Sequence, residues 1–273
     1  MSLIITENDS DECYSQNIAS GSVAIFSIRD PYKESVNEDS LAIIPVDKKS
    51  CVLLVADGAG GMRAGALASS ITVQCINKAV LHGIQKKSEL RDSILDGIEK
   101  ANSEVLALGI GANTTVAVAE IQNNRVRTYH VGDSMIMVVG QQGKLKLQTI
   151  SHSPVGYAVE AGVLGEQEAM LHEERHLVSN MIGDTNMHIS IGPTVQLNAR
   201  DSVLIASDGL FDNLHIDEII EYCRKGAIKK SALKLKDRAC SRMKMEDSMN
   251  PSKPDDLSFI EYRCTPLKIK RIV

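Results

Sequence analysis

Aromatic residues are scarce in this sequence. It has no tryptophan and three phenylalanines, and aromatic residues make up 3% of the chain. Proteins that hold single-stranded nucleic acid by base stacking use aromatic platforms, so this scarcity argues against that class. Long hydrophobic runs are missing as well, because no apolar stretch approaches the roughly 18 to 20 residues of a membrane-spanning helix. The sequence therefore predicts neither a base-stacking protein nor a membrane protein.

A basic surplus is also missing. The 273 residues contain 30 Lys and Arg against 35 Asp and Glu, which gives a formal net charge of −5. Binding to nucleic acid requires clustered basic side chains that neutralise phosphates, so this balance argues against a nucleic-acid partner. None of the six cysteines forms a C-x-x-C pair, which argues against a zinc site. The first residues carry no basic segment of the kind that begins a signal peptide, which predicts a cytoplasmic protein.

The chain does contain many short apolar runs separated by turn residues. Runs rich in β-branched residues predict strands at 22–28, 41–46, 51–56, 114–121, 125–131, 135–140, 194–207 and 257–263. Two pairs of helices are predicted, at 62–85 with 88–108 and at 216–226 with 229–245. Helix pairs between groups of strands predict an α+β fold in layers and not alternating βα units.

The sequence predicts a single domain. Residues 1–20 are expected as a polar N-terminal lead-in, residues 21–264 as the domain and residues 265–273 as a short basic tail. No internal repeat or linker divides the chain. The length is sufficient for one sizeable core.

Acidic residues stand at the ends of five predicted strands. Two of them have near-identical surroundings, since Asp57 and Asp208 each follow an apolar strand and precede a glycine. A carboxylate at the mouth of a buried strand is costly unless it is hydrogen-bonded or paired with a cation. The complete set is Glu38, Asp39, Asp57, Asp133, Asp208, Asp255 and Asp256.

Divalent metal ions are the counter-charge that these carboxylates predict. No Lys or Arg adjoins Asp57, Asp133 or Asp208 in the sequence. Mg²⁺ and Mn²⁺ prefer oxygen ligands, and a glycine after the aspartate lets the backbone approach closely. Two neighbouring ions would lower the pKa of a bound water, which predicts a metal-dependent hydrolase.

Independent turns, a nucleotide-binding loop and a phospho-acceptor site fit these residues less well. A single aspartate is most often a turn former or a cap, but five acidic strand ends together do not fit independent turns. The glycines of residues 56–65 lack the GK[ST] of a nucleotide-binding loop, and Asp57 would repel a phosphate there. A phospho-acceptor aspartate belongs to a parallel sheet, against which the predicted antiparallel strand order argues.

Six motifs in order give the sequence a resemblance to a known family. They are VNEDS (36–40), ADGAGG (56–61), GANTTVAV (111–118), VGDSMIMVV (131–139), ASDGLFDNL (206–214) and DDLSFIEY (255–262). On these motifs the chain resembles the metal-dependent protein phosphatases, the type-2C serine/threonine phosphatase family, in its compact bacterial-like form. The resemblance covers roughly residues 20–263, and the segment 152–183 is similar to the family's flap region. It implies a four-layer α-β-β-α sandwich of two antiparallel β-sheets flanked by helix pairs.

The resemblance also implies a reaction and its metal ligands. Phosphoserine or phosphothreonine would be hydrolysed by a metal-activated water, without a phosphoenzyme, on two Mn²⁺ or Mg²⁺ ions. Asp57 resembles the carboxylate that bridges both ions, and the Gly58 carbonyl resembles a ligand of the first. Asp208 and Asp255 resemble ligands of the second.

Four further acidic residues have roles by the same resemblance. Glu38 and Asp39 look like the pair that holds metal-bound waters, so they join Asp57 as expected catalytic residues. Asp133 and Asp212 match positions that bind a weaker third metal in some members.

The phosphate-binding position departs from the family's pattern. Many members carry an arginine for the substrate phosphate four residues before the glutamate of the acidic pair, and this chain has Glu34 there. Lys33 or Arg29 is the expected substitute. A lysine would supply a point charge and not a planar fork.

Two more positions depart from the pattern. Ala59 stands where some members carry a general-acid histidine, so the source of the leaving-group proton is left open. Asp256 stands where an asparagine is usual, so Asp255 is preferred to Asp256 as a ligand by alignment only.

The implied partners are a phosphorylated protein substrate and a cognate serine/threonine kinase or its targets, with no nucleic acid, no membrane and a monomeric state. The alternative function is a catalytically impaired phosphoprotein-binding or regulatory module with the same fold. The missing phosphate arginine favours that alternative, and the intact set of Asp57, Asp208 and Asp255 argues against it. Another metal-dependent hydrolase is a further alternative.

Overall fold

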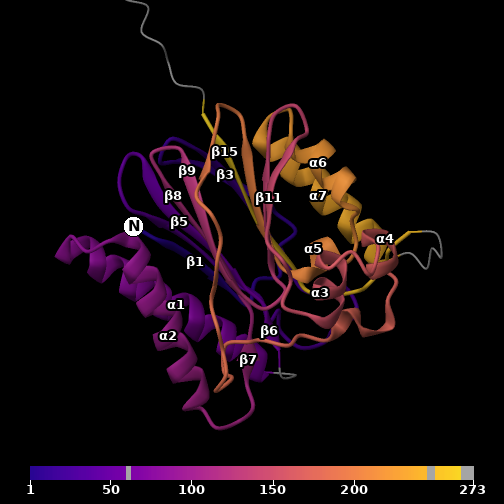
Figure 1. Ribbon diagram of the computed structural model, residues 1–273, viewed down its shortest axis with the longest axis horizontal. Helices are drawn as coiled ribbons and strands as arrows, with labels where there is room; N and C mark the ends of the chain where they lie inside the picture. The colour runs from indigo at the N-terminus through magenta and orange to yellow at the C-terminus, as the bar shows by residue number, and fades with distance from the viewer. Residues whose placement is uncertain (60–62, 245–249, 266–273) are drawn as a thin grey trace, which may run out of the picture.

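Two antiparallel β-sheets pack face to face, and helices cover both outer faces (Figure 1). The computed structural model describes residues 1–59, 63–244 and 250–265. In this part of the chain the first sheet has seven strands. They are β1 (Leu3–Thr6), β4 (Ser40–Pro45), β5 (Ser50–Ala56), β8 (Val116–Gln122), β9 (Arg125–Val131) and β12 (Ser190–Ile191) in spatial order, with β13 (Val195–Gln196) also paired to β9.

The second sheet has six strands. Their spatial order is β11 (Leu145–Gln148), β10 (Met135–Val139), β14 (Ser202–Ala206), β15 (Leu257–Cys264), β3 (Gly21–Ile28) and β2 (Tyr14–Ile18). A separate two-stranded ladder joins β6 (Gly58–Ala59) to β7 (Asn113–Thr114). These antiparallel sheets confirm the predicted α+β sandwich.

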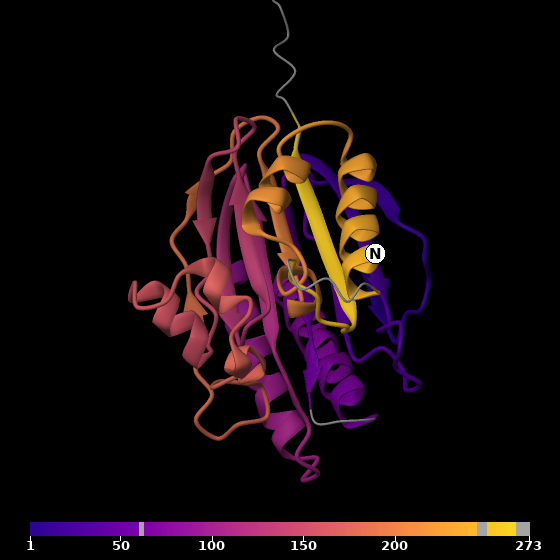
Figure 2. The same ribbon diagram turned by 90° about the vertical axis from the view of Figure 1, so that its right-hand side faces the viewer.

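One pair of long helices lies on each sheet. The pair α1 (Arg63–Lys86) and α2 (Leu90–Leu106) packs on the first sheet, and the pair α6 (Ile216–Cys223) and α7 (Ile228–Met243) packs on the second. Figure 2 turns α6 and α7 toward the viewer. The short elements are α3 (Pro154–Glu160), α4 (Glu166–Ala169), the 3₁₀ helix Glu173–His176 and α5 (Asp208–Phe211).

The alternation of side chains along β5 shows how the four layers are held together. Successive side chains of a strand point to opposite faces of its sheet. Cys51, Leu53 and Val55 therefore pack between the two sheets, while Val52 and Leu54 pack beneath α1 and α2. All five are fully buried. The central strands are thus covered on both faces, which fixes where their ends lie.

The N-terminal segment differs from the prediction. Residues 1–20, expected as a polar lead-in, contain β1 and β2, which form one edge of each sheet. Strand β11 is a third edge strand that the apolar pattern does not predict. These strands have four or five residues and are only partly buried, so their apolar alternation is weak.

Part of the predicted domain organisation concerns residues that the structure does not describe. Residues 266–273 of the expected basic tail lie outside them, and the domain boundaries 21–264 stay a prediction. Where the structure describes the chain, no helix has the length and apolar character needed to cross a membrane.

Candidate metal centre

Strand pairing in the first sheet places two acidic residues side by side. Ser40 of β4 pairs with Ala56 of β5. Asp39 precedes Ser40 and Asp57 follows Ala56, so both reach the same rim of the sandwich.

Strand pairing in the second sheet also brings acidic residues to one end of the sheet. Met135 of β10 pairs with Ala206 of β14, so Asp133, in the turn before β10, lies at the same end as Asp208, which begins α5. Strand β15 is antiparallel to β14, and Asp255 lies two residues before its start, at that end as well. The hydroxyl of Ser207, the residue before Asp208, donates to the Asp39 carboxylate at 2.9 Å, so the acidic strand ends of both sheets meet at one rim.

The backbone of Asp57 is fixed by the ladder of β6 and β7. The Thr114 hydroxyl donates to the Asp57 carbonyl at 2.7 Å, and the Thr115 N–H donates to the same carbonyl at 2.8 Å. The next residue has to be glycine, because a Cβ on Gly58 would lie 2.8 Å from the Glu38 carbonyl oxygen and still closer to Gly65. The chain can thus bring Asp57 and Glu38 together only with a residue that lacks a side chain.

The gathered carboxyl groups perturb one another. Burial raises the pKa of Asp57 well above its ordinary value, and the nearby charges that raise it further are those of Asp39, Asp208, Asp255 and Asp133. Coulomb interactions weaken with distance and solvent, so these contributions agree with the placement of the five carboxyl groups at one rim by the strand ends. Five of the predicted site residues are therefore brought together.

Two of these groups, Asp133 and Asp255, share a second pattern with Asp212. Burial raises the pKa of Asp133 and of Asp255 to about 7, and the charge of Asp208 is the next contributor in both cases. Burial and the charge of Asp208 also raise the pKa of Asp212. A set of perturbed carboxyl groups in one place is typical of a functional site.

Within residues 1–59, 63–244 and 250–265, three buried carboxylate oxygens at the rim accept no hydrogen bond. They are Oε1 of Glu38, Oδ1 of Asp39 and Oδ2 of Asp212, of which the last forms an ion pair with Lys253. The other oxygen of Asp39 accepts a hydrogen bond from the Ser207 hydroxyl at 2.9 Å. A buried, unsatisfied carboxylate oxygen is costly, and a hard divalent cation with its waters removes that cost. The donor set therefore fits Mn²⁺ or Mg²⁺.

The carboxylates do not form a complete coordination shell. Over residues 1–59, 63–244 and 250–265, no three Asp, Glu, His or Cys side chains are close enough together to hold a metal ion as they stand. A lysine lies among three of them instead. The Lys253 Nζ is 2.5 Å from Asp208, 2.8 Å from Asp212 and 3.1 Å from Asp255.

Lys253 corrects one prediction from the sequence. The absence of a basic neighbour in the sequence was the reason for expecting only metal ions as counter-charge, and that reason is wrong for Asp208. Burial alone would lower the pKa of Lys253, but the charges of the surrounding aspartates outweigh it and raise the pKa. The signal in the sequence is the short spacing from Lys253 to Asp255, which a search for basic residues next to Asp57, Asp133 and Asp208 does not reach.

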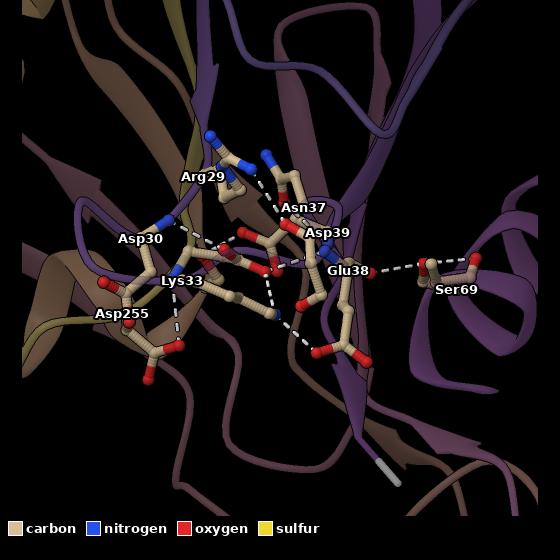
Figure 3. Close-up of polar contacts among 12 residues, drawn as sticks. Arg29, Asp30, Lys33, Asn37, Glu38, Asp39, Ser69 and Asp255 are labelled. Atoms are coloured by element: carbon tan, nitrogen blue, oxygen red, sulfur yellow. Dashed lines mark hydrogen bonds and ion pairs between the residues drawn. The ribbon is translucent and has the colours of Figure 1, made fainter. Parts of the chain in front are cut away.

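Lys33 points toward Glu38, in the loop before β4 (Figure 3). Its ammonium forms ion pairs with Glu38 and, at 2.8 Å, with Asp256. Asp256 also accepts the backbone N–H groups of Asp30 at 2.8 Å and Glu38 at 2.7 Å. Asp256 therefore holds the loop before β4 in place, whereas Asp255 points to Lys253.

Arg29 has a different environment. Its guanidinium donates to the carbonyl oxygens of Glu34 at 3.3 Å and Ser35 at 3.2 Å, and it pairs with Asp9 at 3.2 Å. Of the two candidates for the phosphate position, only Lys33 contacts a carboxylate of the expected catalytic set.

A cavity of about 390 Å³ adjoins the acidic rim. Asp133, Asp208 and Asp212 line one part of it. The rest combines polar and charged side chains, such as Glu160, Glu166 and Arg175, with apolar side chains from the segment after β11 and from the α5–α6 region. The apolar side chains form one wall. They include Val155, Val159, Met170, Phe211, Leu214 and Ile216.

Comparison with known proteins agrees with this geometry. The family model for protein phosphatase 2C matches residues 31–236. The chain belongs to the protein phosphatase 2C family. The resemblance seen in the motifs is thereby confirmed, and as a family member the chain is a protein serine/threonine phosphatase.

Three relatives show how far the similarity to protein phosphatase 2C extends. A putative protein phosphatase 2C-type protein of Streptococcus pyogenes is 34% identical over 196 residues, which cover 69% of this chain and 78% of that protein. The serine/threonine phosphatase of S. agalactiae is 25% identical, with a TM-score of 0.73 over 91% of this chain and 99% of the other. The catalytic domain of the phosphatase PstP, solved in complex with two manganese ions, shares the fold at 24% identity. Its TM-score is 0.67 over 89% of this chain and 97% of the other.

Proposed function

We propose that this protein phosphatase 2C domain hydrolyses phosphoserine and phosphothreonine in proteins with the help of two Mn²⁺ or Mg²⁺ ions. The residues that would hold the ions are Asp57, Gly58, Asp208 and Asp255, with Asp133 and Asp212 available to a weaker third ion. When bound, the ions would lower the pKa of a water molecule and neutralise charge on the phosphoryl oxygens.

The gathering of carboxylates from both sheets at one rim is the observation that carries this proposal. The Ser207 hydroxyl, beside Asp208, donates to Asp39 at 2.9 Å, and the charges of aspartates from both sheets raise the pKa of Asp57. Glu38 and Asp39 each have a buried oxygen free to accept hydrogen bonds from water. These two residues would orient attacking water by accepting its protons in hydrogen bonds.

The contacts also support a choice between Asp255 and Asp256. Both oxygens of Asp256 accept hydrogen bonds from the loop that contains Lys33 and Glu38. Asp255 shares a cation with Asp208, so it is the one placed to share a metal ion with it. Asp256 would position the loop and not bind metal.

Lys33 is the better candidate for the substrate phosphate. Its ammonium lies at Glu38, within the expected catalytic set. Arg29 is engaged with backbone carbonyls of the same loop, so it would brace the loop instead. A single ammonium gives less geometric selection of a phosphate than an arginine fork.

The cavity beside the rim is a place for the polypeptide of the substrate. It joins the acidic site to an apolar wall, and an apolar side chain next to the phosphorylated residue would be buried there. Residues lining this wall would then affect protein substrates more than small phosphoesters.

Other attributes stay predictions from the sequence. They are a cytoplasmic location, a monomeric state, a cognate serine/threonine kinase, the number of ions and a signalling role. The impaired module with the same fold gains no support from the contacts described above.

The proposal is tested by turnover of p-nitrophenyl phosphate and of a phosphothreonine peptide. Activity should appear with Mn²⁺, and EDTA or Asp57→Asn should lower it at least about a hundredfold, because both remove the ligation of the ions. The exposed Asp47→Asn is the matched control and should keep full activity. Turnover that survives chelation or Asp57→Asn would overturn the mechanism, and no turnover of any phosphoester with Mn²⁺ would favour the impaired module.

A further inference from the structure

The side chain of Lys253 is inserted among three carboxylates that the proposed function assigns to metal ions. Its Nζ lies 2.5 to 3.1 Å from oxygens of Asp208, Asp212 and Asp255, and only 20% of the side chain is exposed. An exposed surface ion pair is weak and poorly fixed. An ammonium with three carboxylate partners in a mostly buried position is a different arrangement, because it neutralises charges that solvent cannot reach well.

The backbone of Lys253 is fixed by one buried side chain. Asn213 is completely buried, and its Oδ1 accepts the Lys253 N–H at 2.9 Å while its Nδ2 donates to the Lys253 carbonyl at 2.8 Å. The same Nδ2 donates to the Gly209 carbonyl at 2.9 Å. Asn213 therefore ties Lys253 to α5, the element that carries Asp208 and leads to Asp212. This attachment sets the distance between the lysine and its partners.

Lys33, the other lysine described at the rim, has partners of a different kind. Lys33 pairs with Glu38 and Asp256, neither of which is assigned as a direct metal ligand. Lys253 instead pairs with three residues that are all assigned as metal ligands. A divalent ion held by Asp208 and Asp255 needs the same oxygens, and it repels an ammonium at contact distance.

We propose that Lys253 is a tethered counter-ion that competes with divalent metal for Asp208, Asp212 and Asp255. In the metal-free chain its ammonium neutralises these aspartates and keeps α5 and the start of β15 together. Metal binding displaces the ammonium, whose flexible four-carbon stem lets it leave the site while its backbone stays attached to Asn213. The metal affinity of this part of the site is therefore set by the competition as well as by the ligands. This inference rests on the proposed metal site.

The test is a Mn²⁺ titration of the metal-free protein by isothermal titration calorimetry, without substrate. We expect Lys253→Met to bind the ion at Asp208 and Asp255 about tenfold more tightly than the original chain, because the competitor is gone. Its metal-free form should melt at a lower temperature, because three carboxylates lose their cation. Lys253→Arg keeps the charge and should bind Mn²⁺ as weakly as the original chain.

A matched control removes a comparable lysine elsewhere. Lys146 is paired with Asp201 and its side chain is 19% exposed, so Lys146→Met removes a similarly buried ammonium far from the rim. It should leave Mn²⁺ affinity unchanged. Circular dichroism of each variant checks that it folds, and Lys253→Gln replaces Lys253→Met if the latter does not.

The outcomes separate this inference from the proposed function. Equal or weaker Mn²⁺ binding by the folded, neutral Lys253 variant overturns the counter-ion, whatever the turnover. Equal tightening in Lys253→Arg overturns it as well, because charge would then not be the cause. Normal Mn²⁺ binding without turnover of any phosphoester would instead overturn the proposed function and leave the counter-ion intact.

Discussion

Between the two sheets, Leu53, Val203 and Ile260 are fully buried among other apolar side chains. At the rim Asp39 is almost as inaccessible, yet one of its carboxylate oxygens has no hydrogen-bond partner in the part of the chain that the structure describes. The burial of apolar surface in the interior therefore stabilises the folded protein. The burial of charges at the rim destabilises it.

This contrast indicates a division of roles between the two regions. Apolar burial on both faces of the sheets supplies the stability that holds the acidic strand ends together. This stability offsets the cost of holding several carboxylates close together at the rim, where they can bind cations. Substitutions in the interior should then change stability alone, and substitutions at the rim should change activity and stability in opposite directions.

The largest expected effect is at the interior. Leu53→Ala should lower the free energy of unfolding by about 2–5 kcal/mol, because it leaves a cavity between tightly packed sheets. Chemical denaturation measures this loss, and Mn²⁺ affinity of the remaining folded protein should not change. A large change in Mn²⁺ affinity would show that the two regions are not separate.

At the rim, Asp39→Asn should have the opposite signature. Activity should fall about 10- to 100-fold, because the residue that holds water beside the ligands loses its charge. The thermal midpoint of the metal-free protein should rise, because a buried negative charge with one unsatisfied oxygen is removed. A variant that loses both activity and metal-free stability would contradict the division of roles.

A neutral polar group at the rim gives a prediction about pH. His152 accepts hydrogen bonds on Nδ1 from the Gly132 N–H at 3.1 Å and from Asn180 at 2.8 Å. Burial, together with the neighbouring His130 and His188, lowers the pKa of His152 to about 4. Between about 6.5 and 4 the unfolded chain therefore binds the proton and the folded chain does not. The contribution of neutral His152 to stability is therefore fully present above about pH 6.5 and is lost as the pH falls toward 4.

The His152 contribution should amount to about 1–3 kcal/mol. Because the buried aspartates with raised pKa act in the opposite direction, it is measured as the difference between the original chain and His152→Asn in denaturation at pH 7 and pH 5. His152→Asn keeps an acceptor without a titrating ring, so its stability should depend less on pH. Equal acid sensitivity in both proteins would show that His152 is not the titrating group.

The smallest expected effect concerns the cavity. Val159→Lys should raise KM for a phosphothreonine peptide by about threefold to tenfold, because a charged chain enters an apolar wall. The KM for p-nitrophenyl phosphate should stay unchanged. Val163, which is 81% exposed and does not line the cavity, supplies the control Val163→Lys. Equal effects on both substrates would show that the cavity does not bind the polypeptide.

Much of the fold and most of the acidic set could be predicted from the sequence because their signals are local. An apolar run followed by an aspartate and a glycine is visible at Asp57 and Asp208 without any knowledge of the fold. The central strands are buried on both faces, so their apolar runs are long and easily recognised. The edge strands β1, β2 and β11 are short and half-covered, so they have no such signal.

The sequence names Lys33 as a candidate cation of the site, but the partners of Lys33 and the presence of Lys253 could not be predicted, because the paired residues are distant in the chain. Lys33 reaches Asp256 across 223 positions, and Lys253 reaches Asp208 across 45. Only the antiparallel order of β14, β15 and β3 brings these segments together. A sequence pattern records neighbours along the chain, and an ion pair of this kind is set by the sheet.

The segment between β11 and β12 is attached to the domain near both of its ends. At one end the His152 N–H donates to the Gly132 carbonyl at 3.0 Å. At the other, Ile182 exchanges two backbone hydrogen bonds with Thr114, the residue whose hydroxyl holds the Asp57 carbonyl. We expect substitutions in α3 and α4, between these anchors, to leave Asp57 in place. Because both helices line the cavity proposed for the polypeptide, such substitutions should change the preference among protein substrates while the acidic rim keeps its arrangement.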